Sequence, residues 1–266
     1  MSLISNKRIF YINSRNRLTG TDSDFTYTLD YKNEDYDYVV VLQASIPKSY
    51  YLVQHGKNTF VLNEDGNQTQ VTVPEGNYTR TSFMAQLQTS LNAASFHHWS
   101  YSVTIPSLST TGDTGKYTYS VSGNGGIQPQ FIIGSSLFEQ LGFNEDTTYS
   151  FVGDELISAN VIKLQIEDTL FIHSDIASNG VDNVLQEVFA VDSPDFGNLL
   201  WVCPDVEAYS KQLGTNKSNS YRFYLTDEDG NSIDLNGQNF VMTIMLYKKQ
   251  NVYELIKKMI MLELIK

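Results

Sequence analysis

Cysteine is almost absent from this chain: its 266 residues include only Cys203. A disulfide within one chain is therefore impossible. A lone cysteine is most often a small, buried apolar residue. A catalytic thiol would need a histidine brought close by the fold, and no pattern in the sequence indicates one. We therefore interpret Cys203 as a packing residue.

Long apolar runs are also missing. The N-terminal stretch MSLISNKRIF lacks the apolar segment of a secretory signal, and no apolar run elsewhere is long enough to cross a bilayer. Together with the single cysteine, this predicts a protein that is made and folds in a reducing cell interior, with no membrane among its partners.

Basic residues are outnumbered, since 18 Lys and Arg stand against 30 Asp and Glu, a formal net charge of -12. This balance argues against a surface that binds nucleic acid as a whole. The basic residues gather at the two ends of the chain. The first seventeen residues carry Lys7, Arg8, Arg15 and Arg17 and no acid, and the last nineteen carry five lysines and two glutamates.

Aromatic residues are plentiful at 12%, with 17 Tyr and 14 Phe, which favours strands over helices. Residues 24–30 alternate between apolar and polar side chains, as in a half-buried strand. Residues 38–47 begin with a continuous apolar run, which is typical of a strand covered on both faces. Residues 58–63 and 69–74 flank an Asp-Gly turn and predict a hairpin.

The pattern changes within residues 67–150. Apolar residues at helical spacing follow Thr79, which we predict to be an N-cap. The stretch SSLFEQLGF, residues 135–143, predicts a second, short helix that begins at a serine cap. Strand-like segments resume after residue 150. Near the C-terminus, residues 252–265 carry an apolar stripe at helical spacing.

These patterns predict a mainly β fold in three parts. A discontinuous body covers residues 1–66 and 151–247, an inserted α+β domain covers 67–150, and an amphipathic helical tail covers 248–266. About eight body strands without βαβ alternation indicate a β-sandwich, and a single jelly roll with an insert fits best. An immunoglobulin-like sandwich remains possible, although its Cys-Trp-Cys pattern needs two cysteines.

The acidic stretch TDEDGNSIDLNG, residues 226–237, is the first candidate metal site. Asp227, Asp229 and Asn231 have the spacing of an EF-hand loop. However, Ser232 occupies the position that needs glycine, and Gln238 the position of the bidentate glutamate. A hairpin connection between two strands, built from an Asp-Gly and an Asn-Gly turn, is the better interpretation.

The four histidines do not predict a metal site either. His97 and His98 are adjacent and lack an obvious third ligand, and His55 and His173 stand alone. The glycine-rich SGNGGI, residues 122–127, lacks the Lys-Ser/Thr of a phosphate-binding loop, and no catalytic motif is present. We therefore predict no catalytic, cofactor-binding or metal-binding residue, no cofactor, and a protein that is not an enzyme.

Six segments, taken in order, carry a resemblance to a known family. They are IFYINSRNRLTGTDSDFTYTLD (9–30), VVVLQASIPKSYYLV (39–53), NTFVLNEDG (58–66), VTVPEGNYTRTSFMAQLQTSLN (71–92), FEQLGF (138–143) and FYLTDEDGNSIDLNGQNFVMTIML (223–246). In this order and spacing they resemble the penton proteins, the minor capsid proteins of the vertices, of virophages and Polinton-type viruses, mavirus-like virophages in particular.

This resemblance implies a single jelly roll with an inserted domain. It implies a structural virion protein, assembled inside the host cell, whose homopentamer forms each icosahedral vertex among trimers of a double jelly-roll major capsid protein. It implies no catalytic residue. The segment SRNR, residues 14–17, matches the leading segment of the family, where it has a structural role near the first strand.

A soluble jelly-roll binding module, of the carbohydrate-binding or fibre-base type, is the alternative that the residues leave open. A sugar site would need an aromatic stacking platform, for which Trp99 and Trp201 are the obvious candidates. Packing in a core or an interface is the commoner role of tryptophan. Mass in solution and ring symmetry would separate the two functions.

The basic ends suggest a role within the capsid interpretation. The first and last strands of a jelly roll are neighbours, so both ends would emerge on the same side of the body. We therefore predict a basic base that includes Lys7, Arg8, Arg15 and Arg17. It would contact packaged DNA or neighbouring capsomers without sequence specificity.

Overall fold

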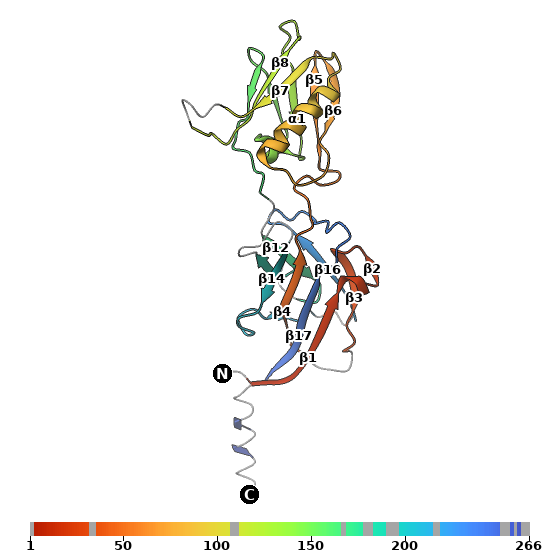
Figure 1. Cartoon of the computed structure of the whole chain (residues 1–266). Coiled ribbons are helices and arrows are strands. Elements are labelled where there is room, and N and C mark those ends of the chain that lie inside the picture. Colours follow the sequence, from red (N-terminus) through yellow and green to blue (C-terminus); the bar gives the residue numbers. More distant parts are fainter. Residues whose placement is uncertain are drawn as a thin grey trace. The chain divides into compact units, whose positions relative to one another are not determined.

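The computed structural model describes residues 3–31, 36–106, 112–165, 169–177, 183–189, 197–214, 219–250, 256–257 and 260–261. The chain is mainly β, and every strand pair among these residues is antiparallel (Figure 1). It divides into two compact units. We call them the body, Met1–Tyr50 with Glu167–Lys266, and the insert, Tyr51–Ile166.

The body contains two sheets. Sheet A has the strand order β1-β17-β4-β14, with β15 also paired to β4, and sheet B has the order β13-β12-β16-β3-β2. The strands of sheet A are β1 (Leu3–Asn13), β4 (Tyr38–Pro47), β14 (Asn198–Val202), β15 (Lys211–Gln212) and β17 (Val241–Gln250). The strands of sheet B are β2 (Thr19–Gly20), β3 (Asp24–Thr28), β12 (Thr169–Ser174), β13 (Val184–Phe189) and β16 (Ser220–Thr226).

β1 and β17 are paired along their whole length. Leu3 lies opposite Gln250 at one end, and Asn13 lies opposite Val241 at the other. The start of β1 and the finish of β17 therefore share one end of sheet A, as Figure 1 shows.

Aromatic side chains join the two sheets in the core of the body. The ring of Phe25, on β3, lies 5.9 Å from that of Phe223, on β16. It lies 5.5 Å from that of Phe240, which immediately precedes β17 in sheet A. All three side chains are buried. Because alternate residues of a strand point to opposite faces, these phenylalanines fill the space between the sheets.

The outer face of sheet A is covered over part of its area. Val40, Met245 and Tyr247 form a second apolar cluster there, with Cys203 among the residues packed against it. Consecutive residues Val39, Val40 and Val41 are all fully buried, so the predicted coverage of this strand on both faces is confirmed. Burial raises the pKa of the Cys203 thiol, which is consistent with a packing role.

The insert contains two further sheets and helix α1 (Arg80–Ala94). Sheet C has the order β10-β9-β5-β6 and sheet D the order β11-β8-β7. Their strands are β5 (Thr59–Glu64), β6 (Asn67–Thr72), β7 (Ser100–Thr104), β8 (Thr118–Ser122), β9 (Gln130–Ile133), β10 (Thr147–Ser150) and β11 (Glu155–Ile157). Helix α1 packs on β6 and β7. One cluster of 21 buried apolar residues forms the core of the insert.

The division between the units differs from the predicted boundaries at 67 and 150, both of which fall inside the insert. The hairpin of β5 and β6 is confirmed. However, β5 also pairs with β9, so its assignment to the body is wrong. At the second boundary, β11 pairs with β8 and extends the insert beyond residue 150. Strand character alone does not reveal which unit supplies a strand's partner.

Helix α1 begins where the sequence predicts. The Thr79 hydroxyl accepts a hydrogen bond from the Ser82 N–H at 3.2 Å, and the Ser82 hydroxyl accepts one from the Thr79 N–H at 2.9 Å, forming a capping box. The second predicted helix is α3 (Phe138–Leu141), but its serine cap is wrong. Leu137 occupies the N-cap position with φ of 59°, because its side chain is buried in the insert core.

The predicted hairpin connection at residues 226–237 is also wrong. β16 belongs to sheet B and β17 to sheet A, so the acidic stretch between them passes from one sheet to the other. The expected turns are present, since Gly230 and Gly237 have φ of 80° and 77°, a region that favours glycine. The turns were readable from the sequence, but the partners of the flanking strands were not.

The predicted tail helix, 252–265, lies mostly outside the described residues. Only residues 256–257 and 260–261 are described there, and these are helical. In the part of the chain that the structure describes, no helix is both long and apolar enough to span a membrane.

Candidate functional site

The metal-ligand candidates do not come together. Among the described residues, no group of three or more His, Cys, Asp or Glu side chains is placed to hold a metal ion. The Asp227 carboxylate instead accepts hydrogen bonds from the backbone N–H of Asp229 at 3.0 Å and of Asn231 at 2.7 Å. These bonds hold the turn and use the oxygens that a cation would need.

The histidines lie in separate environments. His55 is exposed and lies 2.7 Å from Glu75. The ring of His97 stacks on that of Trp99 with centroids 5.3 Å apart, whereas His98 has a φ of 57° in the turn between them. His173 is buried in β12, where its Nε2 atom lies 2.9 Å from the Thr226 hydroxyl. These surroundings match structural roles.

The two tryptophans do not form an open platform for a sugar ring. Trp99 and Trp201 each expose only 8% of their surface. The Trp201 Nε1–H donates to the Val41 carbonyl at 3.1 Å, and Tyr209 packs on its ring at 5.0 Å. Trp99 belongs to the insert core. A stacking site requires an exposed aromatic face, which both side chains lack.

Glu64 is a buried acid that the sequence reasoning missed. It is fully buried at the end of β5, where its carboxylate accepts three hydrogen bonds. The donors are the Ser95 hydroxyl at 2.8 Å, the Tyr101 hydroxyl at 2.7 Å and the His97 N–H at 2.9 Å. Glu64 follows Phe60 and Leu62 at every second position of β5, and this alternation was the signal in the sequence that could have predicted its burial. Because all its bonds go to the protein, Glu64 stabilises the insert core.

The SRNR segment builds a pocket at the end of β1. Residues Ser14–Asn16 form a 3-10 helix, η1. The Ser14 hydroxyl donates to Asn239 Oδ1 at 3.1 Å, and the Ser14 N–H donates to the Phe240 carbonyl at 3.1 Å. These bonds tie η1 to the stretch before β17. The pocket between them is about 520 Å³ and is lined by Arg15, Arg17, Leu18, Thr19, Gly20, Asp22, Gly237 and Asn239.

Two arginines of different character line this pocket. Arg17 is held in place, since its Nε donates to the Gly20 carbonyl and its Nη1 to the Ser14 carbonyl, each at 3.0 Å. The Arg15 side chain is exposed and forms no hydrogen bond or ion pair with any described residue. Asp22, the acid in the lining, is likewise unpaired within the described residues. The three formal charges sum to +1.

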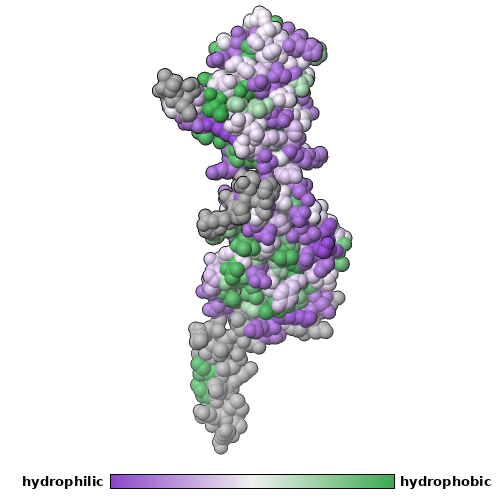
Figure 2. Space-filling model, in the orientation of Figure 1, coloured by the Kyte–Doolittle hydropathy of each residue, from purple (hydrophilic) through white to green (hydrophobic). Residues whose placement is uncertain are grey.

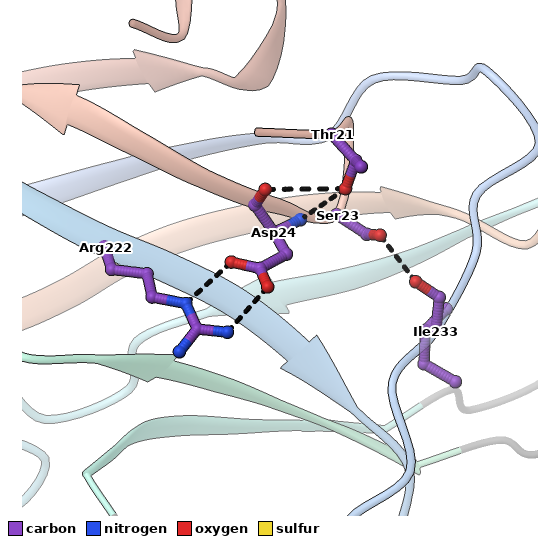
Figure 3. A network of polar contacts seen from close by, with 5 residues as sticks. All are labelled: Thr21, Ser23, Asp24, Arg222 and Ile233. Carbon is purple, nitrogen blue, oxygen red and sulfur yellow. Dashed lines mark hydrogen bonds and ion pairs between the residues drawn. The ribbon is translucent and has the colours of Figure 1, made fainter. Parts of the chain in front are cut away.

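The adjoining turn, Thr21–Asp24, is held by hydrogen bonds and by an ion pair that neutralises its carboxylate. Figure 3 shows Arg222 facing Asp24, with its Nε and Nη2 atoms 2.7 and 2.6 Å from the two carboxylate oxygens. The Thr21 N–H donates to the Asp24 carbonyl at 2.7 Å, and the Ser23 hydroxyl donates to the Ile233 carbonyl. Because Asp24 and Arg222 neutralise each other, Arg15 and Arg17 are the cations of the pocket.

The tertiary structure separates the basic residues that the sequence groups together. Lys7 and Arg8 lie in the middle of β1, opposite Tyr247 and Leu246, and the lysines that finish β17 lie toward the end of sheet A at which β1 starts. Arg15 and Arg17 follow Asn13 at the opposite end. The seven residues from Lys7 to Asn13 span six steps along the strand, or about 20 Å. The prediction of one shared basic base is therefore wrong for Arg15 and Arg17.

Comparisons with known proteins find likeness at the level of structure and not of sequence. No protein-family model matches the chain, and no curated protein matches its sequence. Among solved structures, the chain is similar to the crystal structure of the mavirus penton protein. The sequence identity is 11% and the TM-score 0.43, and the alignment covers 91% of this chain and 100% of that one. Similarity at this level assigns neither a family nor a function to the chain.

Proposed function

We propose that this chain is a structural capsid protein whose homopentamer forms the vertex of an icosahedral viral shell. Its body would be a single jelly roll. The strand order of the two body sheets carries the proposal. Leaving aside the two-residue strands β2 and β15, the described residues of the body form eight strands. Numbered along the chain, they run 1-8-3-6 in sheet A and 5-4-7-2 in sheet B.

This order is the pattern expected when a chain folds back on itself and rolls up. The first strand pairs with the last, the second with the seventh, the third with the sixth and the fourth with the fifth. Viral capsid proteins and lectin domains both use this arrangement. The sequence segments that resemble virophage penton proteins favour the capsid protein, and the buried tryptophans count against the lectin type.

The position of the insert agrees with this proposal. It interrupts the chain between the third and fourth of the eight strands, β4 and β12, and has a core cluster of its own. A connection between strands at the end of a sandwich accepts an added domain readily, because lengthening a loop adds little closure entropy. Changes within the insert can therefore leave the fold of the body, and its contacts to neighbouring subunits, intact.

An exposed apolar area on sheet A supports assembly with further copies. Tyr11, Leu200 and Val202 expose 75%, 65% and 73% of their surfaces, and they point to the outer face of the sheet. Figure 2 shows hydrophobic residues gathered on the face of the body in view. Tyr11 is on the edge strand β1, and Leu200 and Val202 are on the opposite edge strand β14, with Thr243 and Gln43 between them. Exposed apolar side chains mark contact surfaces, and their presence at both edges suits a closed ring, which needs two different faces on each subunit.

Within this proposal, the vertex is surrounded by a double jelly-roll major capsid protein. The lysines that finish β17, with Lys7 and Arg8 farther along β1, would form a basic region that does not include Arg15 and Arg17. This region would contact packaged DNA or the neighbouring capsomers. Charge attraction of this kind is independent of sequence and weakens as salt is raised.

The mass and symmetry of the purified full chain test the proposal. We expect a particle of five chains by analytical ultracentrifugation and fivefold rings by electron microscopy. We also expect incorporation at vertices when the chain is co-expressed with a double jelly-roll capsid protein. A protein that remains monomeric under all these conditions would contradict the proposal, and a monomer that binds a glycan array would establish the binding module instead.

Paired surface variants sharpen this test. Tyr11→Glu combined with Leu200→Glu places two charges on the outer face of sheet A and is expected to weaken ring formation. Val152→Glu is the matched control, because Val152 exposes 81% of its surface on the insert. Its rings should form normally. If the double variant and the Val152 variant assembled equally well, this face would be excluded from the subunit contact. That result would not contradict the pentamer itself.

A further inference from the structure

We propose that the pocket at η1 binds a single carboxylate of a peptide segment, with an apolar side chain next to that carboxylate. The cations Arg15 and Arg17 would hold the carboxylate, and Leu18 would contact the apolar neighbour. The ligand would belong to a partner protein. This inference goes beyond the proposed capsid function and does not depend on it.

The guanidinium groups are the reason for a carboxylate. Arginine presents parallel N–H donors that match the two oxygens of a carboxylate, and such charge-assisted pairs are among the stronger hydrogen bonds. Arg17 is already fixed by the Gly20 and Ser14 carbonyls, so little side-chain entropy is lost when its remaining Nη2 donates to a ligand. Arg15 has no partner among the described residues and completes the pair of cations.

The walls of the pocket are rigid at the positions that hold the arginines. Gly20 has a φ of 97°, and a Cβ atom there would lie 2.2 Å from the Asp24 carbonyl oxygen. Only glycine therefore permits this close approach. The Gly20 carbonyl that accepts from Arg17 is consequently fixed by the turn itself, and Ser14 is fixed by its bonds to Asn239 and Phe240.

Charge favours one carboxylate over nucleic acid. The lining carries a net formal charge of +1, enough to neutralise one monoanionic group. Asp227, Glu228, Asp229 and Asp234 lie in the same connection that supplies Gly237 and Asn239 to the lining. A nucleic acid brings closely spaced phosphates, and its further charges would meet these acids. An isolated carboxylate avoids that repulsion.

The size and rim of the pocket favour a peptide over a free ion. A volume of about 520 Å³ lies within the range of sites that hold small organic ligands. Leu18 contributes an apolar side chain that exposes 59% of its surface at this site. An inorganic ion would leave both features unused, whereas a segment such as Leu-Glu-Leu would fill the space and cover Leu18.

A peptide pair with and without the charge tests the inference on the full-length chain. The probe is capped Gly-Leu-Glu-Leu-Gly with a neutral fluorophore, and its control replaces Glu with Gln. Anisotropy titrations at low salt should show at least about tenfold tighter binding of the Glu peptide, the ratio expected for a hydrogen-bonded charged group. Equal binding of the two peptides would overturn the inference.

Arginine variants locate the site. Arg15→Gln should weaken binding of the Glu peptide by about tenfold and leave the fold unchanged, because the Arg15 side chain touches no described partner. Arg17→Gln removes two backbone contacts as well, so its melting temperature is measured alongside. Lys7→Gln combined with Lys57→Gln is the control with two altered charges outside the pocket, and should bind like the unmodified chain. Binding that is indifferent to Arg15 overturns the inference.

Competitors identify the chemical class. Inorganic phosphate and a single-stranded thymidine oligonucleotide are titrated against the bound Glu peptide. We expect both to displace it only at concentrations well above that of the unlabelled peptide. An oligonucleotide that displaces it more effectively than the peptide, with the same dependence on Arg15, would overturn the carboxylate in favour of a phosphodiester. Ring formation is measured without any probe, so this inference and the capsid proposal can fail separately.

Discussion

The insert and the body assemble their cores from the chain in opposite ways. The insert takes its 21 core residues from the continuous stretch Tyr51–Ile166. The body combines two distant stretches, with Leu3 paired opposite Gln250. The difference indicates that the insert carries its folding information locally, whereas the body exists only when both ends of the chain are present. If this is so, substitutions in one unit should leave the other unit folded.

Separating the two stretches of the body should have the largest effect. A fragment that ends at Ile166 keeps the whole insert but lacks β12 to β17, which supply the partners of β1, β3 and β4. We expect its first 50 residues to be unfolded and the insert to be folded, by proton–nitrogen correlation spectra and limited proteolysis. Residues 51–166 alone should melt cooperatively. An unfolded 51–166 fragment would show that the insert depends on the body.

Removing one aromatic side chain between the sheets should destabilise the body and leave the stability of the insert unchanged. Phe240 is fully buried and contacts Phe25 across the core. Phe240→Ala is expected to cost about 3–5 kcal/mol. In a denaturant titration followed by signals from each unit, the transition of the body should move and that of the insert should not. Leu200→Ala, at an exposed position of the same sheet, is the control and should change little. A shift of both transitions would mean that the units unfold together.

Replacing the buried acid of the insert should cause a somewhat smaller loss of stability, and it should destabilise the insert and not the body. Glu64→Leu leaves the Ser95 hydroxyl, the Tyr101 hydroxyl and the His97 N–H without their acceptor. Unsatisfied buried donors cost about 1–3 kcal/mol each. His97 is exposed and its N–H can turn to water, so we expect the two buried hydroxyls to cost at least about 2 kcal/mol in the insert alone. Glu64→Gln retains one acceptor oxygen and should lose less. If the two substitutions were equally destabilising, the hydrogen bonds would not be the cause.

The smallest effect is expected at the surface of the insert. The Asp113 carboxylate pairs with Arg80 and accepts a hydrogen bond from the Gly115 N–H, and the bond from Arg80 is the main reason that the pKa of Asp113 is lowered below 3.8. A lowered pKa in the folded state adds stability above the unfolded-state pKa, and this is lost as pH falls through the folded-state pKa. Asp113→Asn should therefore lower the melting temperature slightly at neutral pH and not at strongly acidic pH. A difference that persists in acid would contradict this sign.

Local signals were the part of the fold that could be predicted. The Thr79 cap and the hairpin of β5 and β6 depend on residues within a few positions of each other, and both are confirmed. The serine cap before α3 failed because the buried Leu137 occupies the N-cap position. The hairpin connection at residues 226–237 failed because its two flanking strands find their partners in different sheets.

The candidate site divides in the same way. The sequence pointed to Arg15 and Arg17 as unusual, because they stand in a basic segment of an acidic chain. It placed them with Lys7 and Arg8, because charge was counted along the chain. The bonds of Arg17 to the Ser14 and Gly20 carbonyls are local, but the pocket also needs Asn239, whose contact with Ser14 joins residues 225 positions apart. No local pattern encodes such a contact.

The sequence by itself determined that this is a strand-rich chain without a disulfide, with an α+β segment amid strands and a basic start on an acidic protein. Alternation and composition report how each segment divides its surface between core and solvent, and that is a local property. Only the folded structure shows which strands pair, where the insert begins and ends, and that Arg15 and Arg17 lie at the opposite end of sheet A from the lysines that finish β17. Backbone hydrogen bonds are the same for every strand, so pairing is selected only when all the buried faces are packed together.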